Sequence, residues 1–275
     1  MITNYVFFGL VGKPISASVP GGSEIPNTHV GPEAGWEANG VEYAHHKWIG
    51  HFKKREFEEA LEWNKKACEI RSNDPRSGHP DTIAEKRSRA LILAYLGKYD
   101  DAISDISQTL DECEAKPFSN AQGSEILFET MDEASTVHKL AGRYVLADVL
   151  SEKACTGYEA HKEKFGVTHP AALSAMLRRA MLLKDRKKLQ SAKEWFDKAY
   201  ICQKESDPPD FDGIFTMYQR ARLFEELKLD KSSIVDAFTE VKEACDQFLE
   251  KPLGDEDEQN VSAILDLIPP WALVR

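Results

Sequence analysis

The stretch Gly97-Lys98-Tyr99-Asp100-Asp101-Ala102 decides the fold, because it is one of four related segments in the chain. Each segment has a large apolar residue at its third position and alanine at its sixth. The four alanines are 42, 45 and 45 residues apart. A repeat of this length predicts an array of stacked helical hairpins. The other three segments are Arg55-Glu56-Phe57-Glu58-Glu59-Ala60, Gly142-Arg143-Tyr144-Val145-Leu146-Ala147 and Lys187-Lys188-Leu189-Gln190-Ser191-Ala192.

Each of these segments joins two stretches of about 15 residues in which apolar side chains recur at helical spacing. The second repeat shows the pattern most clearly. Its first stripe ends just before Gly97, and its second begins at Ala102. Two packed helices per repeat are therefore predicted, with the stripes Ile83, Ala90, Leu93, Ala94, Tyr95 and Ala102, Ile103, Ile106, Leu110.

The recurring alanines have a steric role, because two helices that cross closely need a small side chain at the contact. Alanine meets this need without the helix penalty of glycine. We expect three sets at helix crossings: Ala90, Ala180 and Ala221 on first helices; Ala60, Ala102, Ala147 and Ala192 on second helices; and Ala67, Ala154 and Ala199 seven residues further on, where Thr109 replaces alanine once.

The chain resembles the tetratricopeptide-repeat (TPR) proteins, and its longer period resembles the kinesin-light-chain variety. That variety often begins a repeat with His-Pro, as His79-Pro80 and His169-Pro170 do here, and proline suits a first helical turn. The resemblance covers residues 36–249. It implies an all-α, right-handed superhelical solenoid of about five helix-turn-helix repeats. In the weakest repeat, the fifth, we expect Ser233 to replace the alanine.

The resemblance divides the chain into three parts. Residues 1–35 are an irregular segment whose glycines and prolines oppose a regular helix, although Tyr5-Val6-Phe7-Phe8 is apolar enough to pack along the solenoid or in its groove. Residues 36–251 form the TPR-like solenoid. Residues 252–275 comprise an acidic linker, a capping helix over residues 259–267, and a tail.

Composition limits the function classes. The 46 acidic and 35 basic residues give a net charge of −11, which opposes binding to nucleic acid, because such surfaces are basic. The longest early apolar run, residues 5–11, is too short to span a bilayer. Five cysteines occur without a Cys-x-x-Cys clip, which indicates reduced core thiols. We therefore expect a cytoplasmic protein that binds neither nucleic acid nor membrane.

Two loops are similar to ligand-binding motifs but lack essential residues. Residues 9–14 resemble a phosphate-binding loop, yet Pro14 stands where a hydroxyl side chain is needed. Residues 207–213 resemble a calcium loop, yet Pro208 and Gln219 occupy ligand positions. The second loop is better interpreted as a helix-capping loop. We predict no cofactor.

The histidines His45, His46 and His51 do not form a metal site on a helix. At about 100° per residue, His45 and His51 differ by about 240°, and His46 and His51 by about 140°. The three rings therefore cannot converge on one ion. His138 is interpreted as a packing histidine, and no metal is predicted.

The resemblance implies that the first helix of each repeat lines a concave groove. Aligning the repeats on their alanines gives the candidate binding residues, which form an apolar and aromatic trough with isolated charges. Chaperone-tail binding is disfavoured, because His45, Ile49 and Leu91 stand where the family's clamp needs Lys and Asn. The candidates are His45, Ile49, Phe52, Arg87, Leu91, Asp132, Thr136, Lys139, Leu177, Met181, Phe215, Tyr218 and Arg222.

Two functions fit this trough. The first is an adaptor that binds a protein or peptide segment in the concave groove, as the fold most often does. The second is a cofactor-free enzyme or a binder of an apolar small molecule, with the N-terminal segment closing the groove into a pocket. Such an enzyme would catalyse proton transfer, isomerisation or cyclisation with acid and base groups chosen from His45, His46, Asp132, Tyr218 and Arg87. The sequence leaves the oligomeric state open.

Overall fold

The structure, a computed structural model, describes residues 40–73, 80–115, 121–166, 169–204, 210–250 and 255–272. The predictions for residues 1–35 lie outside these ranges. Every regular element in the described ranges is helical, as the all-α prediction requires. The described residues fall into two compact units, 40–154 and 155–272.

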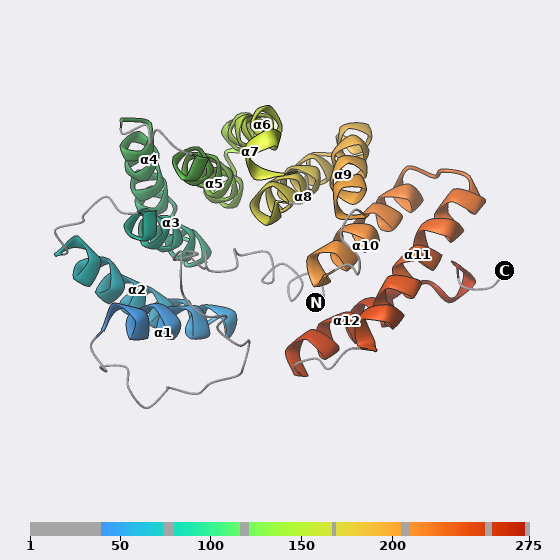
Figure 1. Cartoon of the computed structure of the whole chain (residues 1–275), viewed down its shortest axis with the longest axis horizontal. Helices are drawn as coiled ribbons and strands as arrows, with labels where there is room; N and C mark the ends of the chain where they lie inside the picture. The colour runs from blue at the N-terminus through green and yellow to red at the C-terminus, as the bar shows by residue number, and fades with distance from the viewer. Residues whose placement is uncertain are drawn as a thin grey trace. The chain divides into compact units, whose positions relative to one another are not determined.

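The unit of residues 40–154 consists of helical hairpins in chain order. Consecutive helices pack against each other from α1 to α5, so that each hairpin also contacts the next (Figure 1). Its helices are α1 (Val41–Lys53), α2 (Phe57–Ser72), α3 (Pro80–Tyr95), α4 (Tyr99–Ala115), α5 (Ala121–Leu140) and α6 (Tyr144–Ala160), the last of which continues into the other unit.

The unit of residues 155–272 continues the same pattern and adds two elements. Its apolar core is built from α8 to α12, with Phe196 and Phe238 fully buried. The predicted capping helix is present and begins at Asp255, four residues earlier than expected. The elements are α7 (Lys162–Phe165), α8 (Pro170–Asp185), α9 (Leu189–Lys204), α10 (Phe211–Glu226), α11 (Lys231–Leu249), α12 (Asp255–Leu267) and the short 3-10 helix η3 (Pro270–Ala272).

The turn inside each hairpin ends the first helix with one recurring pair of hydrogen bonds. In the first hairpin, the Arg55 amide donates to the Phe52 carbonyl and the Glu56 amide to the His51 carbonyl, each at 3.0 Å. This is the Schellman motif, which requires a residue in the left-handed conformation. That residue is glycine in only two of the five described turns. The five φ values are 63° at Arg55, 74° at Gly97, 73° at Gly142, 60° at Lys187 and 54° at Lys228.

The fifth turn contains one extra residue, and the prediction for Ser233 is wrong for that reason. In the fourth turn the left-handed residue is Lys187, and the Ala192 amide donates to the carbonyl of the next residue, Lys188. In the fifth turn the left-handed residue is Lys228, and the Ile234 amide donates to the carbonyl of Asp230, which is two residues further along. Asp230 caps α11 by accepting from the Ser233 amide at 2.9 Å. Ile234 therefore occupies the alanine position and is buried.

The other predicted helix crossings are confirmed. All ten alanines in the three predicted sets are 0% exposed, and Thr109 is 1% exposed. Four cysteines are buried and Cys202 is half-buried, as expected for thiols near the ends of second helices. The loop before α10 caps that helix, because Asp210 accepts a hydrogen bond from the Gly213 amide at 2.9 Å. Among the described residues, no helix is long and apolar enough to cross a bilayer.

Candidate functional site

A buried carboxylate joins the first helices of the first two hairpins. Glu85 of α3 is 1% exposed, and its Oε1 lies 2.6 Å from Nδ1 of His45 in α1. Asn64 of α2 donates from Nδ2 to Oε2 of Glu85 at 3.1 Å and to its carbonyl at 3.2 Å. Nε of Arg71 lies 3.7 Å from Oε1. A buried carboxylate is tolerated only with such partners, so Glu85 fixes α1, α2 and α3 to one another.

A second buried contact joins the second and third hairpins. Arg87 of α3 is 5% exposed. Its Nη1 donates to Oε2 of Glu129 in α5 at 2.8 Å, and its Nε lies 3.6 Å from Oε2 of Glu133. The predicted groove residues His45 and Arg87 thus each meet a carboxylate of the next repeat. Their side chains are used in contacts between repeats.

Most of the apolar residues predicted for the groove are packed inside the units. Leu177 and Phe215 belong to the core of residues 155–272, where close packing leaves little of their surface to a ligand. Asp132 is also buried. The buried members of the predicted set are Phe52, Arg87, Leu91 and Asp132 in the unit of residues 40–154, and Leu177, Met181, Phe215 and Tyr218 in the unit of residues 155–272.

The remaining predicted residues are half-exposed. In the unit of residues 40–154 they are His45 and Ile49 on α1 and Thr136 and Lys139 on α5. In the unit of residues 155–272 only Arg222 on α10 is in this class, with 42% of its side chain exposed. We call Ile49, Thr136 and Lys139 the first-helix row, because they combine an apolar, a hydroxyl and a cationic side chain on two first helices.

Burial shifts the pKa of two of the candidate acid and base groups, His46 and Tyr218. Burial, with a smaller effect from His45, lowers the pKa of His46, so its ring is neutral at pH 7. Burial raises the pKa of Tyr218, which keeps its phenol protonated. The His45 and His46 rings lie edge to face at 6.0 Å, but Nδ1 of His45 is engaged by Glu85. His51 instead contacts Glu56 at 2.7 Å.

Glu85, Asn64, Glu129 and Glu133 were missed by the sequence prediction. The available signal was the distance along the chain between side chains that can form a hydrogen bond or ion pair. His45 and Glu85 are 40 residues apart, and Arg87 and Glu129 are 42 apart. Both separations are close to the repeat length, which brings such residues onto neighbouring first helices. In the other unit, Tyr200 and Glu240 are likewise 40 residues apart and 2.9 Å from each other.

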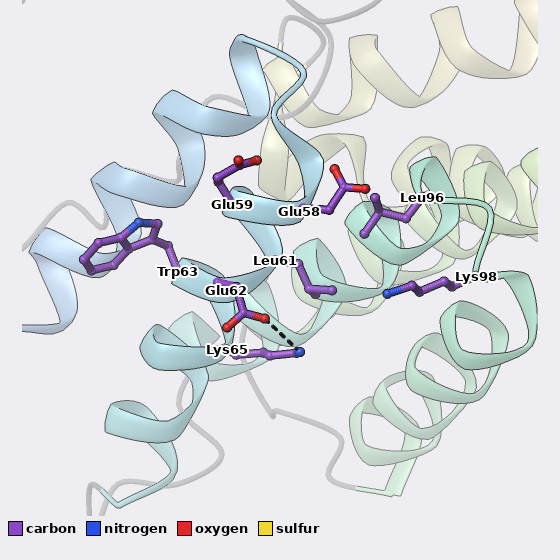
Figure 2. A pocket seen from close by; sticks show the side chains of 8 residues that line it. All are labelled: Glu58, Glu59, Leu61, Glu62, Trp63, Lys65, Leu96 and Lys98. Atoms are coloured by element: carbon purple, nitrogen blue, oxygen red, sulfur yellow. Dashed lines mark hydrogen bonds and ion pairs between the residues drawn. The ribbon is translucent and has the colours of Figure 1, made fainter.

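A surface hollow is lined by residues outside the predicted set. Figure 2 shows its lining side chains, which come from α2 and from the turn that follows α3. Lys65 contacts Glu62 at 3.3 Å across one helical turn. None of the predicted binding residues lines this hollow, and its lining is Glu58, Glu59, Leu61, Glu62, Trp63, Lys65, Leu96 and Lys98.

Comparison with known proteins gives the fold. No protein family profile matches the chain, and no curated protein matches it. A kinesin-light-chain-like structure of Podospora anserina, built of nearly identical TPR-like repeats, is similar with a TM-score of 0.59 at 16% identity over 78% of this chain and 100% of that one. BtubC (BKLC) from P. vanneervenii gives a TM-score of 0.57 at 12% identity over 81% and 83%.

A third similar structure is the Rap conjugation gene regulator of plasmid pLS20, solved in complex with the Phr* peptide. Its TM-score is 0.57 at 14% identity, over 87% of this chain and 68% of that chain. At these identities the likeness concerns architecture alone. The consecutive hairpins and the similar structures together show that this chain has the TPR-repeat fold and resembles the kinesin-light-chain-like structures.

Proposed function

We propose that the chain is an adaptor that binds a protein or peptide segment in the concave groove lined by its first helices. The observation that carries the proposal is the coexistence of rigid packing and half-exposed side chains on these helices. The contacts His45–Glu85 and Arg87–Glu129 hold α1, α3 and α5 together. Ile49, Thr136 and Lys139 remain half-exposed beside them. A surface fixed in advance loses less entropy on binding.

The chemistry of the first-helix row indicates the kind of segment that would bind. Ile49 offers apolar contact, and Thr136 and Lys139 offer polar contacts, all within the unit of residues 40–154. An extended segment with apolar and acidic side chains matches these residues. The basic and amide clamp for chaperone tails is absent at His45, Ile49 and Leu91.

The fold adds support by analogy. The Rap regulator has a similar fold and was solved with a bound peptide, and a fold can host more than one function. The free cysteines fit a reducing compartment, so we place the adaptor in the cytoplasm.

The proposal is tested by comparing what the full chain captures when the first-helix row is changed. Ile49→Glu with Lys139→Glu reverses the chemistry of the row, and Ser107→Glu, at an exposed site on α4, is the matched control. We expect one protein to be captured by the unchanged chain and by Ser107→Glu but not by the row variant. Equal capture by all three, or a stoichiometric small molecule in native mass spectrometry without a protein partner, would contradict the adaptor.

A further inference from the structure

One ring nitrogen of His45 is unpartnered within the part of the chain that the structure describes. Nδ1 of His45 lies 2.6 Å from Oε1 of Glu85, and the ring forms no other hydrogen bond with the described residues. The second nitrogen, Nε2, is not buried, and the side chain is 24% exposed. The rings of His46 and Trp48 lie edge to face with the imidazole, with centroids 6.0 and 5.4 Å away. Nε2 is therefore a well-positioned polar atom that a ligand can reach.

This nitrogen belongs to a residue beside the first-helix row. His45 and Ile49 are four residues apart on α1 and therefore lie on the same face of the helix. Ile49 is half-exposed as well. The helix α1 thus presents an apolar side chain and a free ring nitrogen next to each other. His46 lies about 100° further round the helix and is exposed, so it offers the same chemistry on another face.

The contact with Glu85 decides the hydrogen-bonding role of Nε2. Glu85 is 1% exposed, and Oε2 of its carboxylate accepts from Nδ2 of Asn64 at 3.1 Å, which holds Oε1 toward His45. Nε of Arg71 lies 3.7 Å from the same Oε1. A carboxylate can only accept a hydrogen bond, so Nδ1 of His45 carries a proton. The second nitrogen of a neutral imidazole is then an acceptor. Nε2 of His45 is therefore presented as a hydrogen-bond acceptor.

We infer that Nε2 of His45 accepts a hydrogen bond from an N–H group of the bound segment, an inference that rests on the proposed binding groove. Glu85 is the positioning residue, because it keeps the proton on Nδ1. Lys139 carries donors only and binds acceptors of the segment, so His45 recognises a group that Lys139 cannot. A matching segment places an N–H donor beside an apolar side chain that packs on Ile49. The donor is a backbone amide or a side-chain N–H, and the binding experiment separates the two.

Nitrogen NMR of the full chain with isotope-labelled histidine reads the position of the proton without any ligand. The signal of His45 is assigned by its loss in His45→Asn. At pH 7.5 we expect a proton on Nδ1 and none on Nε2, and Glu85→Ala should remove this preference. A proton on Nε2 in the unchanged chain at this pH would overturn the inference, whether or not Glu85→Ala folds.

The binding experiment uses peptides selected on the full chain from a phage-displayed library of random sequences. Fluorescence anisotropy then compares the unchanged chain with two variants. His45→Asn keeps an amide donor close to Glu85 and removes Nε2, and His46→Asn is the matched control at the exposed neighbour on α1. We expect His45→Asn to weaken binding about fivefold, as for one neutral hydrogen bond, and His46→Asn to leave it unchanged.

Changes in the selected peptide identify the donor that pairs with His45. Each backbone amide is N-methylated in turn, and each side chain that carries an N–H group is replaced by alanine. One of these changes should weaken binding to the unchanged chain but cause no further loss in His45→Asn. If no change behaves in this way, or if His45→Asn and His46→Asn bind equally well, the inference is overturned.

Failure of this inference is distinguishable from failure of the proposed groove. Peptides that require Ile49 and Lys139 but bind His45→Asn unchanged would overturn the role of His45 and leave the groove in place. If no selected peptide loses affinity for Ile49→Glu with Lys139→Glu, the groove proposal fails, and the role of His45 in it fails as well.

Discussion

Replacing Glu85 by alanine removes the carboxylate on which α1, α2 and α3 converge. Glu85 is 1% exposed and contacts His45 at 2.6 Å, Asn64 at 3.1 Å and Arg71 at 3.7 Å. Removing one partner of a buried ionic contact costs about 3–5 kcal/mol. Water reaches part of the His45 and Arg71 side chains, which are 24% and 20% exposed. We therefore expect a loss near the lower end, about 3 kcal/mol.

Urea unfolding followed by circular dichroism measures this loss. With a slope of about 2 kcal/mol per molar urea, the midpoint should fall by about 1.5 M. Glu112→Ala is the matched control, because it removes the 2.6 Å contact with Lys86 between side chains that are 34% and 26% exposed. That contact should contribute at most about 1 kcal/mol, and less in high salt. Equal losses for Glu85→Ala and Glu112→Ala would refute the assignment of Glu85 as the junction between hairpins.

Three further predictions concern the turns, a buried histidine and the thiols. Gly97→Ala should lower the free energy of unfolding by about 1 kcal/mol, because nothing crowds the new methyl group and only the left-handed backbone opposes it. Lys187→Gly, at φ 60°, should raise the free energy of unfolding by a smaller amount in the same urea assay, since glycine also gains freedom in the unfolded chain. If both variants changed the stability in the same direction, this view of the turn would be contradicted. Burial, and to a smaller extent Arg143, lowers the pKa of His138 below 6.5. The folded protein therefore binds a proton at His138 less readily than the unfolded chain does. The free energy of unfolding is unaffected by this residue well above pH 6.5 and decreases as the pH falls through and below 6.5. His138→Leu, which copies Leu93 and Leu183 at the same turn position, should reduce the loss of stability between pH 7.5 and pH 5.5, and an unchanged loss would exclude His138 as its source. Burial raises the pKa of Cys68 to about 11 and that of Cys245 to about 12. Iodoacetamide at pH 8 should therefore label half-buried Cys202 first, as followed by peptide mass spectrometry. Faster labelling of Cys68 than of Cys202 would contradict the packing of α2.

The alanines show how far the sequence predicts this fold. Ala60, Ala102, Ala147 and Ala192 locate four second helices correctly, because each crossing has room only for a methyl group. The fifth hairpin departs from the pattern at Asp230, whose side chain caps α11 and shifts the buried position to Ile234. A one-residue change in a turn has no periodic signal, so the alignment placed Ser233 there instead.

The candidate site was less predictable than the fold. Helical periodicity gives the direction in which a side chain leaves its helix, but not the neighbour that it meets. Arg87 was selected as a groove cation, and in the structure it binds Glu129 of the next hairpin. Leu177 was selected as a lining residue, and it is 1% exposed within a core. Burial depends on contacts between repeats, and the positions of residues within one repeat do not predict those contacts.

The two polar residues of the first-helix row differ in exposure from a neighbouring residue of the predicted set. Thr136 and Lys139 stay half-exposed on α5 although neighbouring Asp132 is buried. Their positions one helical turn apart predict a shared face, and alignment with Ile49 of α1 follows from the repeat. Our central proposal is that this face binds a partner.

Site-specific photo-crosslinking tests that proposal most directly. A photoreactive phenylalanine analogue is placed at Thr136 on α5 or, as the control, at Ser107 on the exposed face of α4, in the full chain within its own cells. We predict that the Thr136 position crosslinks to a single protein or peptide and that the Ser107 position does not. Equal crosslinking at both positions, or crosslinking at Ser107 alone, would contradict binding along the first helices.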